Sequence, residues 1–113
     1  PSDAPENVTA RNTSSQSIMV TWNKIRPRTV VGGDILGYRV LYTTQEDATR
    51  WSRVISGEEN TKAELKDLKI YTMYCVRVMG YNRRGDGIAS LPVCAYTDKD
   101  GKILLRKCES YRP

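Results

Sequence analysis

Hydrophobic and polar residues alternate along much of this chain, and the clearest run lies between Tyr74 and Asn82. Tyr74, Val76 and Val78 fall on one side of this run, and the residues between them fall on the other. A period of two predicts a β-strand with one side turned toward a core. The Gly85-Asp86-Gly87 sequence that follows predicts a turn into a partner strand, because glycine readily adopts positive φ.

The same alternation predicts six more strands, so that the whole chain is expected to be all-β. These strands cover residues 5–11, 17–22, 36–43, 51–55, 61–65 and 88–97. Pro5 and Pro92 predict that the first and last strands are edge strands, because proline cannot donate to a ladder. The inward positions predict a core of Trp22, Tyr38, Val40, Tyr42, Leu68, Tyr74, Val76 and Val78.

Tyr74 opens its strand six residues after Leu68. In two-sheet sandwiches, a tyrosine at this position returns its hydroxyl group to the backbone a few residues upstream and secures the connection between the sheets. We therefore predict a tyrosine corner at Tyr74.

These features together resemble the fibronectin type III family. The late part of the resemblance consists of Leu68, Tyr74, Val76, Val78, Asn82, Gly85, Gly87 and Ser90, and the early part consists of residues 5–8, 17–22 and 37–42. The resemblance implies a seven-stranded, two-sheet immunoglobulin-like sandwich over residues 1–98. Residues 99–113 are then expected to be a C-terminal extension or a linker to a following module. A fold alone does not assign a function, because function depends on sites carried by the fold.

Composition argues against catalysis. The 113 residues suffice for one domain, and the net charge is +5 with no histidine in the chain. Histidine is the commonest general base and the commonest metal ligand, and no nucleophile or phosphate-binding motif is present. We therefore expect no enzyme activity, no metal and no cofactor. No apolar run is long enough to span a bilayer.

The tripeptide Arg84-Gly85-Asp86 at the predicted turn has the spelling of an integrin-binding motif. An arginine and a carboxylate separated by glycine are able to reach an acidic pocket and a bound cation together. The turn pattern of the family already accounts for Gly85, so an ordinary turn is the alternative reading.

Basic residues are expected to gather at the same pole of the sandwich: Lys24, Arg26, Arg28, Arg83 and Arg84. Such a cluster suits a sulfated glycosaminoglycan or an acidic protein surface. Glu58 and Glu59 are expected nearby, so a charge-balanced end is the alternative. Nucleic acid is not an expected partner, because no aromatic platform is interleaved with the basic residues.

A third candidate is a partner surface on the outward side of the predicted central strands. Its residues are Arg39, Leu41, Arg77, Met79, Tyr81 and Tyr96. Aromatic residues, methionine and arginine are enriched at protein interfaces, although scattered exposed apolar residues are also normal.

Asn7 and Asn12 both begin glycosylation sequons, which supports a secreted parent protein. Of the three cysteines, Cys75 and Cys94 are expected to face each other on neighbouring strands, whereas Cys94 and Cys108 flank a predicted turn. We favour a disulfide between Cys94 and Cys108, because it would hold the C-terminal extension against the sandwich. A Cys75–Cys94 disulfide and a fully reduced state are the alternatives.

Residues 37–40 and 81–87 are similar to repeats of neural immunoglobulin-superfamily adhesion proteins and receptor tyrosine phosphatases. This resemblance implies a non-catalytic extracellular module of a membrane-anchored adhesion molecule or receptor. The module would act as a spacer beside adjacent modules and as a binding surface for other cell-surface or matrix proteins. Alternatives are a matrix module that binds integrin, an ectodomain module of a receptor tyrosine phosphatase, and an intracellular scaffold array.

Overall fold

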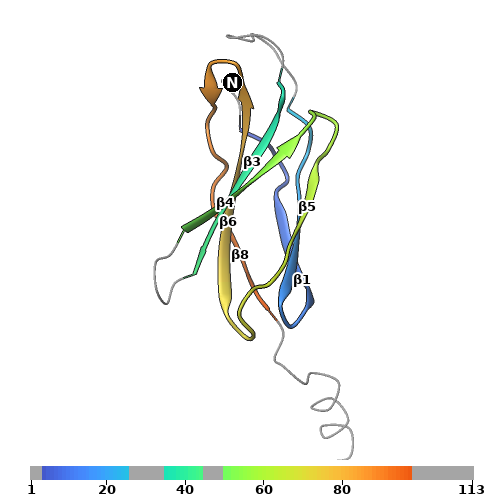
Figure 1. Ribbon diagram of the computed structural model, residues 1–113, viewed down its shortest axis with the longest axis vertical. Helices are drawn as coiled ribbons and strands as arrows, with labels where there is room; N and C mark the ends of the chain where they lie inside the picture. The colour runs from blue at the N-terminus through green and yellow to red at the C-terminus, as the bar shows by residue number, and fades with distance from the viewer. Residues whose placement is uncertain (1–3, 26–34, 45–49, 98–113) are drawn as a thin grey trace, which may run out of the picture.

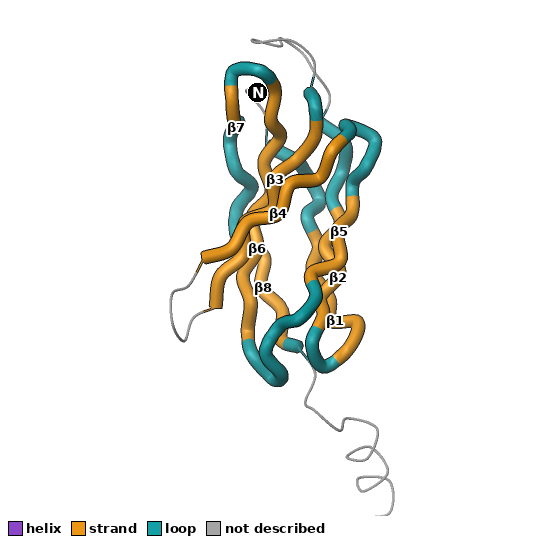
Figure 2. The backbone as a smooth tube through the Cα atoms, viewed as in Figure 1, coloured by secondary structure: helices purple, strands orange, loops and turns teal. Residues whose placement is uncertain are grey.

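Two antiparallel β-sheets pack face to face in the computed structural model, which describes residues 4–25, 35–44 and 50–97 (Figure 1). The smaller sheet has the strand order β1 (Thr9–Ser14), β2 (Ser17–Thr21) and β5 (Lys62–Leu65). The larger sheet has the order β4 (Arg50–Ser56), β3 (Gly37–Thr44) and β6 (Met73–Asn82), and β6 also pairs with β7 (Gly85–Asp86) and β8 (Val93–Tyr96). The described part of the chain contains strands and loops and no helix (Figure 2). The predicted all-β sandwich is thereby confirmed.

The first predicted strand begins later than expected. β1 starts at Thr9, because Asn7 has a φ of 54° and this left-handed conformation interrupts an extended strand. The preceding segment is still attached to the sheet, since the Asn23 backbone N–H donates to the Glu6 carbonyl group over 2.8 Å.

The last predicted strand, residues 88–97, is shorter than expected, since only Val93–Tyr96 forms β8, and Gly85 and Asp86 of the predicted turn form β7 instead. β7 closes a hairpin with β6, and β8 resumes the pairing at Val93. Between them, the Ser90 hydroxyl group accepts a hydrogen bond from the Val78 N–H over 2.9 Å, and the Ser90 N–H donates to the Val78 carbonyl group over 2.8 Å. This double contact replaces the regular ladder beside Pro92, which has no N–H to donate.

The core lies between the sheets and contains the residues that the alternation predicted. Tyr38, Val40, Val76 and Val78 are completely buried, and Trp22, Leu68 and Tyr74 are buried beside them. The rings of Trp22 and Tyr38 meet edge to face with their centroids 5.4 Å apart. Tyr42 differs from the other predicted core residues: it is only partly buried and stacks on Trp51 at the margin of the core.

The predicted tyrosine corner is confirmed. The hydroxyl group of Tyr74 accepts a hydrogen bond from the Lys69 backbone N–H over 2.8 Å. The end of β8 is bound to the same corner, since the Thr97 hydroxyl group donates to the Lys69 carbonyl group over 2.7 Å and accepts from the Thr72 N–H over 2.9 Å. The corner therefore holds the connection between β5 and β6 and the end of the described C-terminal segment together.

Replacing Tyr74 with phenylalanine is expected to lower the free energy of unfolding by about 1–2 kcal/mol, because the ring stays and the buried hydrogen bond to Lys69 is lost. Denaturant unfolding monitored by tryptophan fluorescence measures this change. Tyr96→Phe is the matched control, since this exposed ring lies outside the corner and its replacement should leave the stability unchanged. Equal stability of Tyr74→Phe and the unsubstituted chain would contradict the role given to the hydroxyl group.

Candidate functional site: the outward face of the larger sheet

The pairing of β3 with β6 sorts their side chains into two faces. Val40 lies opposite Val78 on the buried side, whereas Arg39 lies opposite Met79 on the outward side. Because successive side chains in a strand point to opposite sides, the neighbouring pairs follow the same alternation. The register therefore determines which residues share the outward side.

Five of the six predicted partner-surface residues lie together on this outward side. We call them, together with Val54, the outer face: Arg39, Leu41, Arg77, Met79, Tyr81 and Val54. Arg39 pairs with Met79 on one side and with Val54 on the other, and Leu41 pairs with Arg77 in the next outward row. These residues are direct neighbours across three strands, so the outer face is continuous.

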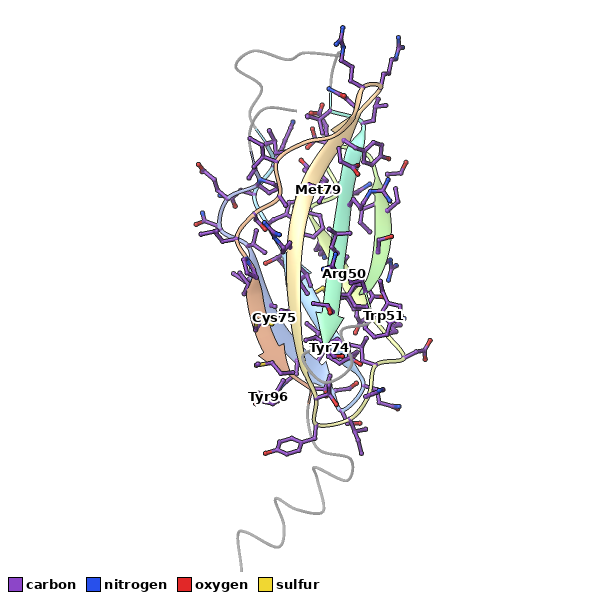
Figure 3. The ribbon with its side chains drawn as sticks, turned by 90° about the vertical axis from the view of Figure 1, so that its left-hand side faces the viewer. Arg50, Trp51, Tyr74, Cys75, Met79 and Tyr96 are labelled. Carbon is purple, nitrogen blue, oxygen red and sulfur yellow. A yellow bond between two sulfur atoms is a disulfide. The ribbon has the colours of Figure 1, made fainter. Side chains whose placement is uncertain are left out.

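Tyr96 does not belong to the outer face. It pairs with Met73 at the other end of β6, on the order of 20 Å along the strand from Met79. The two residues are clearly separated in Figure 3. The ring of Tyr96 stacks instead on Tyr71, with the ring centroids 5.9 Å apart.

Gly37 makes room for the aromatic residue of the outer face. Gly37 lies opposite Tyr81, and a Cβ atom at Gly37 would come within 2.8 Å of the Tyr81 hydroxyl oxygen. A side chain at this position would also collide with the backbone of Ile55. The glycine therefore allows the Tyr81 ring to lie across β3, and this function was not recognised from the sequence.

The outer face has both apolar and cationic character. Met79 is buried, Leu41 and Tyr81 are half-buried, and Val54 is exposed. Arg77 donates from its Nε to the Ser90 carbonyl group over 2.9 Å, which holds the guanidinium group over the sheet. An arginine held in this way keeps its Nη donors for a further acceptor.

Asp86 is the acidic residue that the structure brings to this face. Its Oδ1 accepts from the Nε of Arg39 over 3.1 Å, and both side chains remain partly exposed. This ion pair was not predicted, because Arg39 and Asp86 meet only when β7 folds back along β6. A surface pair of this kind adds little to stability, but it orients both groups.

Arg83 and Arg84 form a tight two-residue turn, so the Arg84-Gly85-Asp86 sequence begins in this turn and continues into β7. Asn82 pairs with Gly85, and the Asn82 side-chain oxygen accepts from the Arg84 N–H over 2.9 Å. Gly85 has a φ of 123°, which agrees with the predicted need for glycine, although this residue opens β7 directly after the turn and is not part of the turn itself. Arg84 is exposed at the tip, whereas Asp86 lies two residues further along the chain, in β7, and its carboxylate contacts Arg39. The integrin reading of this tripeptide stays a prediction.

The predicted basic pole is only partly described. Lys24 forms an ion pair with Glu59, with Nζ and Oε2 2.6 Å apart, and this hydrogen bond raises the pKa of Lys24 above its usual value. Glu59, one of the two predicted acidic neighbours, therefore balances the positive charge of Lys24. Arg83 and Arg84 are exposed, and the remaining two predicted residues, Arg26 and Arg28, lie outside the described residues.

The favoured Cys94–Cys108 disulfide is wrong. Cys75 and Cys94 are direct partners in the β6–β8 register, with their Cα atoms 4.0 Å apart, and a disulfide joins them. Cys94 is therefore already paired, and the alternative that placed it opposite Cys75 is confirmed. Cys108 and the predicted extension at residues 99–113 lie outside the described residues.

The two sequon asparagines occupy different environments. Asn7 is exposed in the bend before β1, whereas the side-chain amide of Asn12 donates to the Tyr96 carbonyl group over 3.0 Å. This difference was not visible in the sequence, where both sequons have the same form.

The described ranges contain no group of three or more histidine, cysteine, aspartate or glutamate residues that could hold a metal ion. A search of the same ranges for a helix of the length and apolar character needed to cross a membrane finds none.

Comparison with known proteins matches the chain to one family model, the fibronectin type III domain, over residues 3–95. Protein sidekick-1 of Gallus gallus is 38% identical over 101 residues, which are 88% of this chain and 5% of that protein. The cell adhesion molecule DSCAM of Mus musculus is 32% identical over 109 residues, again 88% of this chain and 5% of that protein. This chain thus spans only a small part of the length of these relatives.

Among solved structures, the crystal structure of chicken CNTN1 FN1-FN3 domains superimposes with a TM-score of 0.78 at 26% identity. The match covers 88% of this chain and 33% of the other chain. A solution structure of the third fibronectin III domain of human KIAA0343 protein has a TM-score of 0.80 at 23% identity, covers 88% of this chain and 84% of that one, and supports the fold.

Replacing Cys75 and Cys94 together with alanine is expected to lower the free energy of unfolding by about 3 kcal/mol, because the disulfide closes a loop with a sequence separation of 19. Chemical unfolding of the double variant and of the unsubstituted chain measures the difference. Cys108→Ala is the matched control and should leave the stability unchanged. Alkylation of the native chain without reductant should spare Cys75 and Cys94, and labelling of either residue would contradict the disulfide.

Proposed function

This chain belongs to the fibronectin type III family, and from that membership we propose that it is a non-catalytic extracellular module of a cell-surface adhesion molecule or receptor. The module acts as a spacer and binds another cell-surface or matrix protein through the outer face. It is homologous to modules of sidekick and DSCAM, which is consistent with a cell-adhesion module. The size of those relatives supports a position beside adjacent modules in one membrane-anchored chain.

The continuous outer face is the observation that carries this proposal. Leu41, Met79 and Tyr81 supply an apolar centre, and Arg39 and Arg77 stand beside it. A central apolar patch with aromatic and arginine residues is the usual composition of the core of a protein interface. Because the guanidinium groups are held by Asp86 and by the Ser90 carbonyl group, a partner loses little arginine side-chain entropy on binding.

The charge of the outer face indicates the chemistry of the partner. In the described residues, Arg39, Arg77 and Arg50 point outward from the larger sheet, and Asp86 pairs with Arg39 alone. A partner that surrounds an apolar patch with carboxylates would complement this arrangement. Its affinity should fall with rising salt, because exposed charges are screened.

The Arg84-Gly85-Asp86 tip supports a second candidate function, integrin binding, because Arg84 is exposed at the end of a tight turn. Its carboxylate would first have to leave Arg39 in order to reach a bound cation. A sulfated glycosaminoglycan at the basic pole has less support, since Glu59 already neutralises Lys24.

Leu41→Asp is expected to weaken binding to a protein partner at least tenfold, because it places a carboxylate at the apolar centre of the outer face. The measurement is binding of the tetramerised chain to a panel of recombinant cell-surface ectodomains. Met19→Asp is the matched control, since Met19 is half-buried on the outward side of β2, the central strand of the smaller sheet. The control variant should bind as the unsubstituted chain does.

Equal binding by Leu41→Asp and the unsubstituted chain would overturn the proposed surface. Equal loss in Leu41→Asp and Met19→Asp would overturn it as well, since the effect would then not depend on the face. Circular dichroism confirms that both variants fold before the binding is compared.

Asp86→Glu is expected to leave cell attachment to the immobilised chain unchanged, because Arg39 holds this carboxylate on the sheet and the proposed contact lies on the outer face. The measurement is attachment of integrin-bearing cells in the presence and absence of divalent cations. Loss of cation-dependent attachment in Asp86→Glu, with Arg83→Lys unchanged as the control, would establish the integrin alternative instead.

A further inference from the structure

We propose that Asn7 carries an N-linked glycan and that Asn12, which begins an equally valid sequon, does not. The inference rests on the extracellular placement in the proposed function, but not on the partner surface. Asn7-Val8-Thr9 and Asn12-Thr13-Ser14 both match the acceptor pattern, so the sequence alone treats them alike. The surroundings of the two side chains separate them.

Asn7 lies where a glycan is able to extend into solvent. It is exposed in the bend that precedes β1, and its side chain makes no hydrogen bond to the described residues. The adjacent Val8 packs against the core, so the chain is anchored beside the acceptor without using the acceptor itself. Asparagine also tolerates the positive φ at this position better than most residues do.

Thr9, the third residue of this sequon, lies at the start of an edge strand. Its hydroxyl group is exposed and shares a hydrogen bond with the Thr21 hydroxyl group on the outward side of the smaller sheet. β1 pairs with β2 on one side, and among the described residues no further strand of the smaller sheet pairs with its other side. The acceptor Asn7 and the hydroxyl residue Thr9 are therefore both at the surface of the finished domain.

Asn12 has the opposite orientation. It pairs with Ile18, which is completely buried, so its side chain leaves β1 on the side of the core, although Asn12 itself is still exposed at the edge of the sandwich. There its amide nitrogen donates to the Tyr96 carbonyl group of β8 over 3.0 Å. β1 and β8 lie side by side at this edge of the sandwich (Figure 2).

The Nδ2 atom that would bear the glycan is thus the atom that links the two sheets. Glycosylation would replace one of the two amide hydrogens of Nδ2, so the sugar would have to share this nitrogen with the hydrogen bond to Tyr96. The finished fold has to hold the glycan in water whether transfer precedes or follows folding. Both asparagines are exposed, but Asn7 is able to carry a glycan without loss of a contact, whereas at Asn12 the glycan would stand on the nitrogen that donates to Tyr96.

The chemistry of the transfer is a nucleophilic substitution. The Asn7 Nδ2 forms a bond to the anomeric carbon of a polyprenyl-diphosphate-linked oligosaccharide while the bond from that carbon to the diphosphate oxygen breaks. The polyprenyl diphosphate leaves, and the transferase takes the proton released from Nδ2. No oxidant or reductant takes part.

The position of Asn7 also fits the proposed surface. Asn7 precedes the edge strand of the smaller sheet, whereas the outer face belongs to β3, β4 and β6 of the larger sheet. A glycan on Asn7 would cover the opposite side of the sandwich and leave the outer face open to a protein.

The test uses the chain of residues 1–113, secreted from mammalian cells behind a cleavable signal peptide. The protein is treated with peptide N-glycosidase in heavy-oxygen water, which converts each glycosylated asparagine into labelled aspartate. Trypsin then cleaves after Arg11 and separates Asn7, in the peptide 1–11, from Asn12, in the peptide 12–24. We expect the label in the first peptide and none in the second.

Three variants check the assignment. Thr9→Ala should abolish the label, Thr9→Ser should keep it because the sequon survives, and Asn12→Gln should leave it unchanged. Label in the peptide 12–24, or a secreted and disulfide-bonded protein without label in the peptide 1–11, would overturn the inference. Binding of unglycosylated protein to ectodomains tests the proposed function separately, so either proposal could fail while the other stands.

Discussion

The register of β6 against its neighbours is the constraint on which the other features of this domain depend. β6 pairs with β3 along one edge and with β7 and β8 along the other. A shift of one residue would exchange the two faces of the strand and bring Met79 into the core in place of Val78. The same shift would separate Cys75 from Cys94 and would remove Tyr74 from the corner.

Much of this register could be predicted from the sequence, because a buried face imposes a period of two and Tyr74 marks where the strand begins. The core residues and the members of the outer face on β3 and β6 follow from that period alone. The disulfide could not be predicted from this period alone. Which residue of β8 faces Cys75 depends on how residues 87–92 leave the ladder, and the Ser90 contact with Val78 that sets this is not visible as a pattern.

The features that the sequence did not predict share one physical origin: they join residues that are distant in the chain and have no periodic relation. The Arg39–Asp86 ion pair connects β3 with β7 across the intervening strand β6, and the bond from Asn12 to Tyr96 connects the two sheets. The alternation of side chains predicts Tyr96 on the partner surface, because alternation gives the side of the sheet on which a residue lies but not its distance along the strand. Gly37 could have been recognised from its position opposite an aromatic residue in the paired strand.

The Cys75–Cys94 disulfide has a mechanical consequence. It does not join the two sheets; it joins the short strand β8 to the ten-residue strand β6 beside it. Cys94 precedes Thr97, the last described residue, by only three positions. Tension applied to the chain beyond Thr97 therefore passes through only three residues before it reaches the disulfide. The load then passes into β6 rather than opening the ladder between β6 and β8 one hydrogen bond at a time. If the chain is pulled from this end, the arrangement would keep the outer face intact.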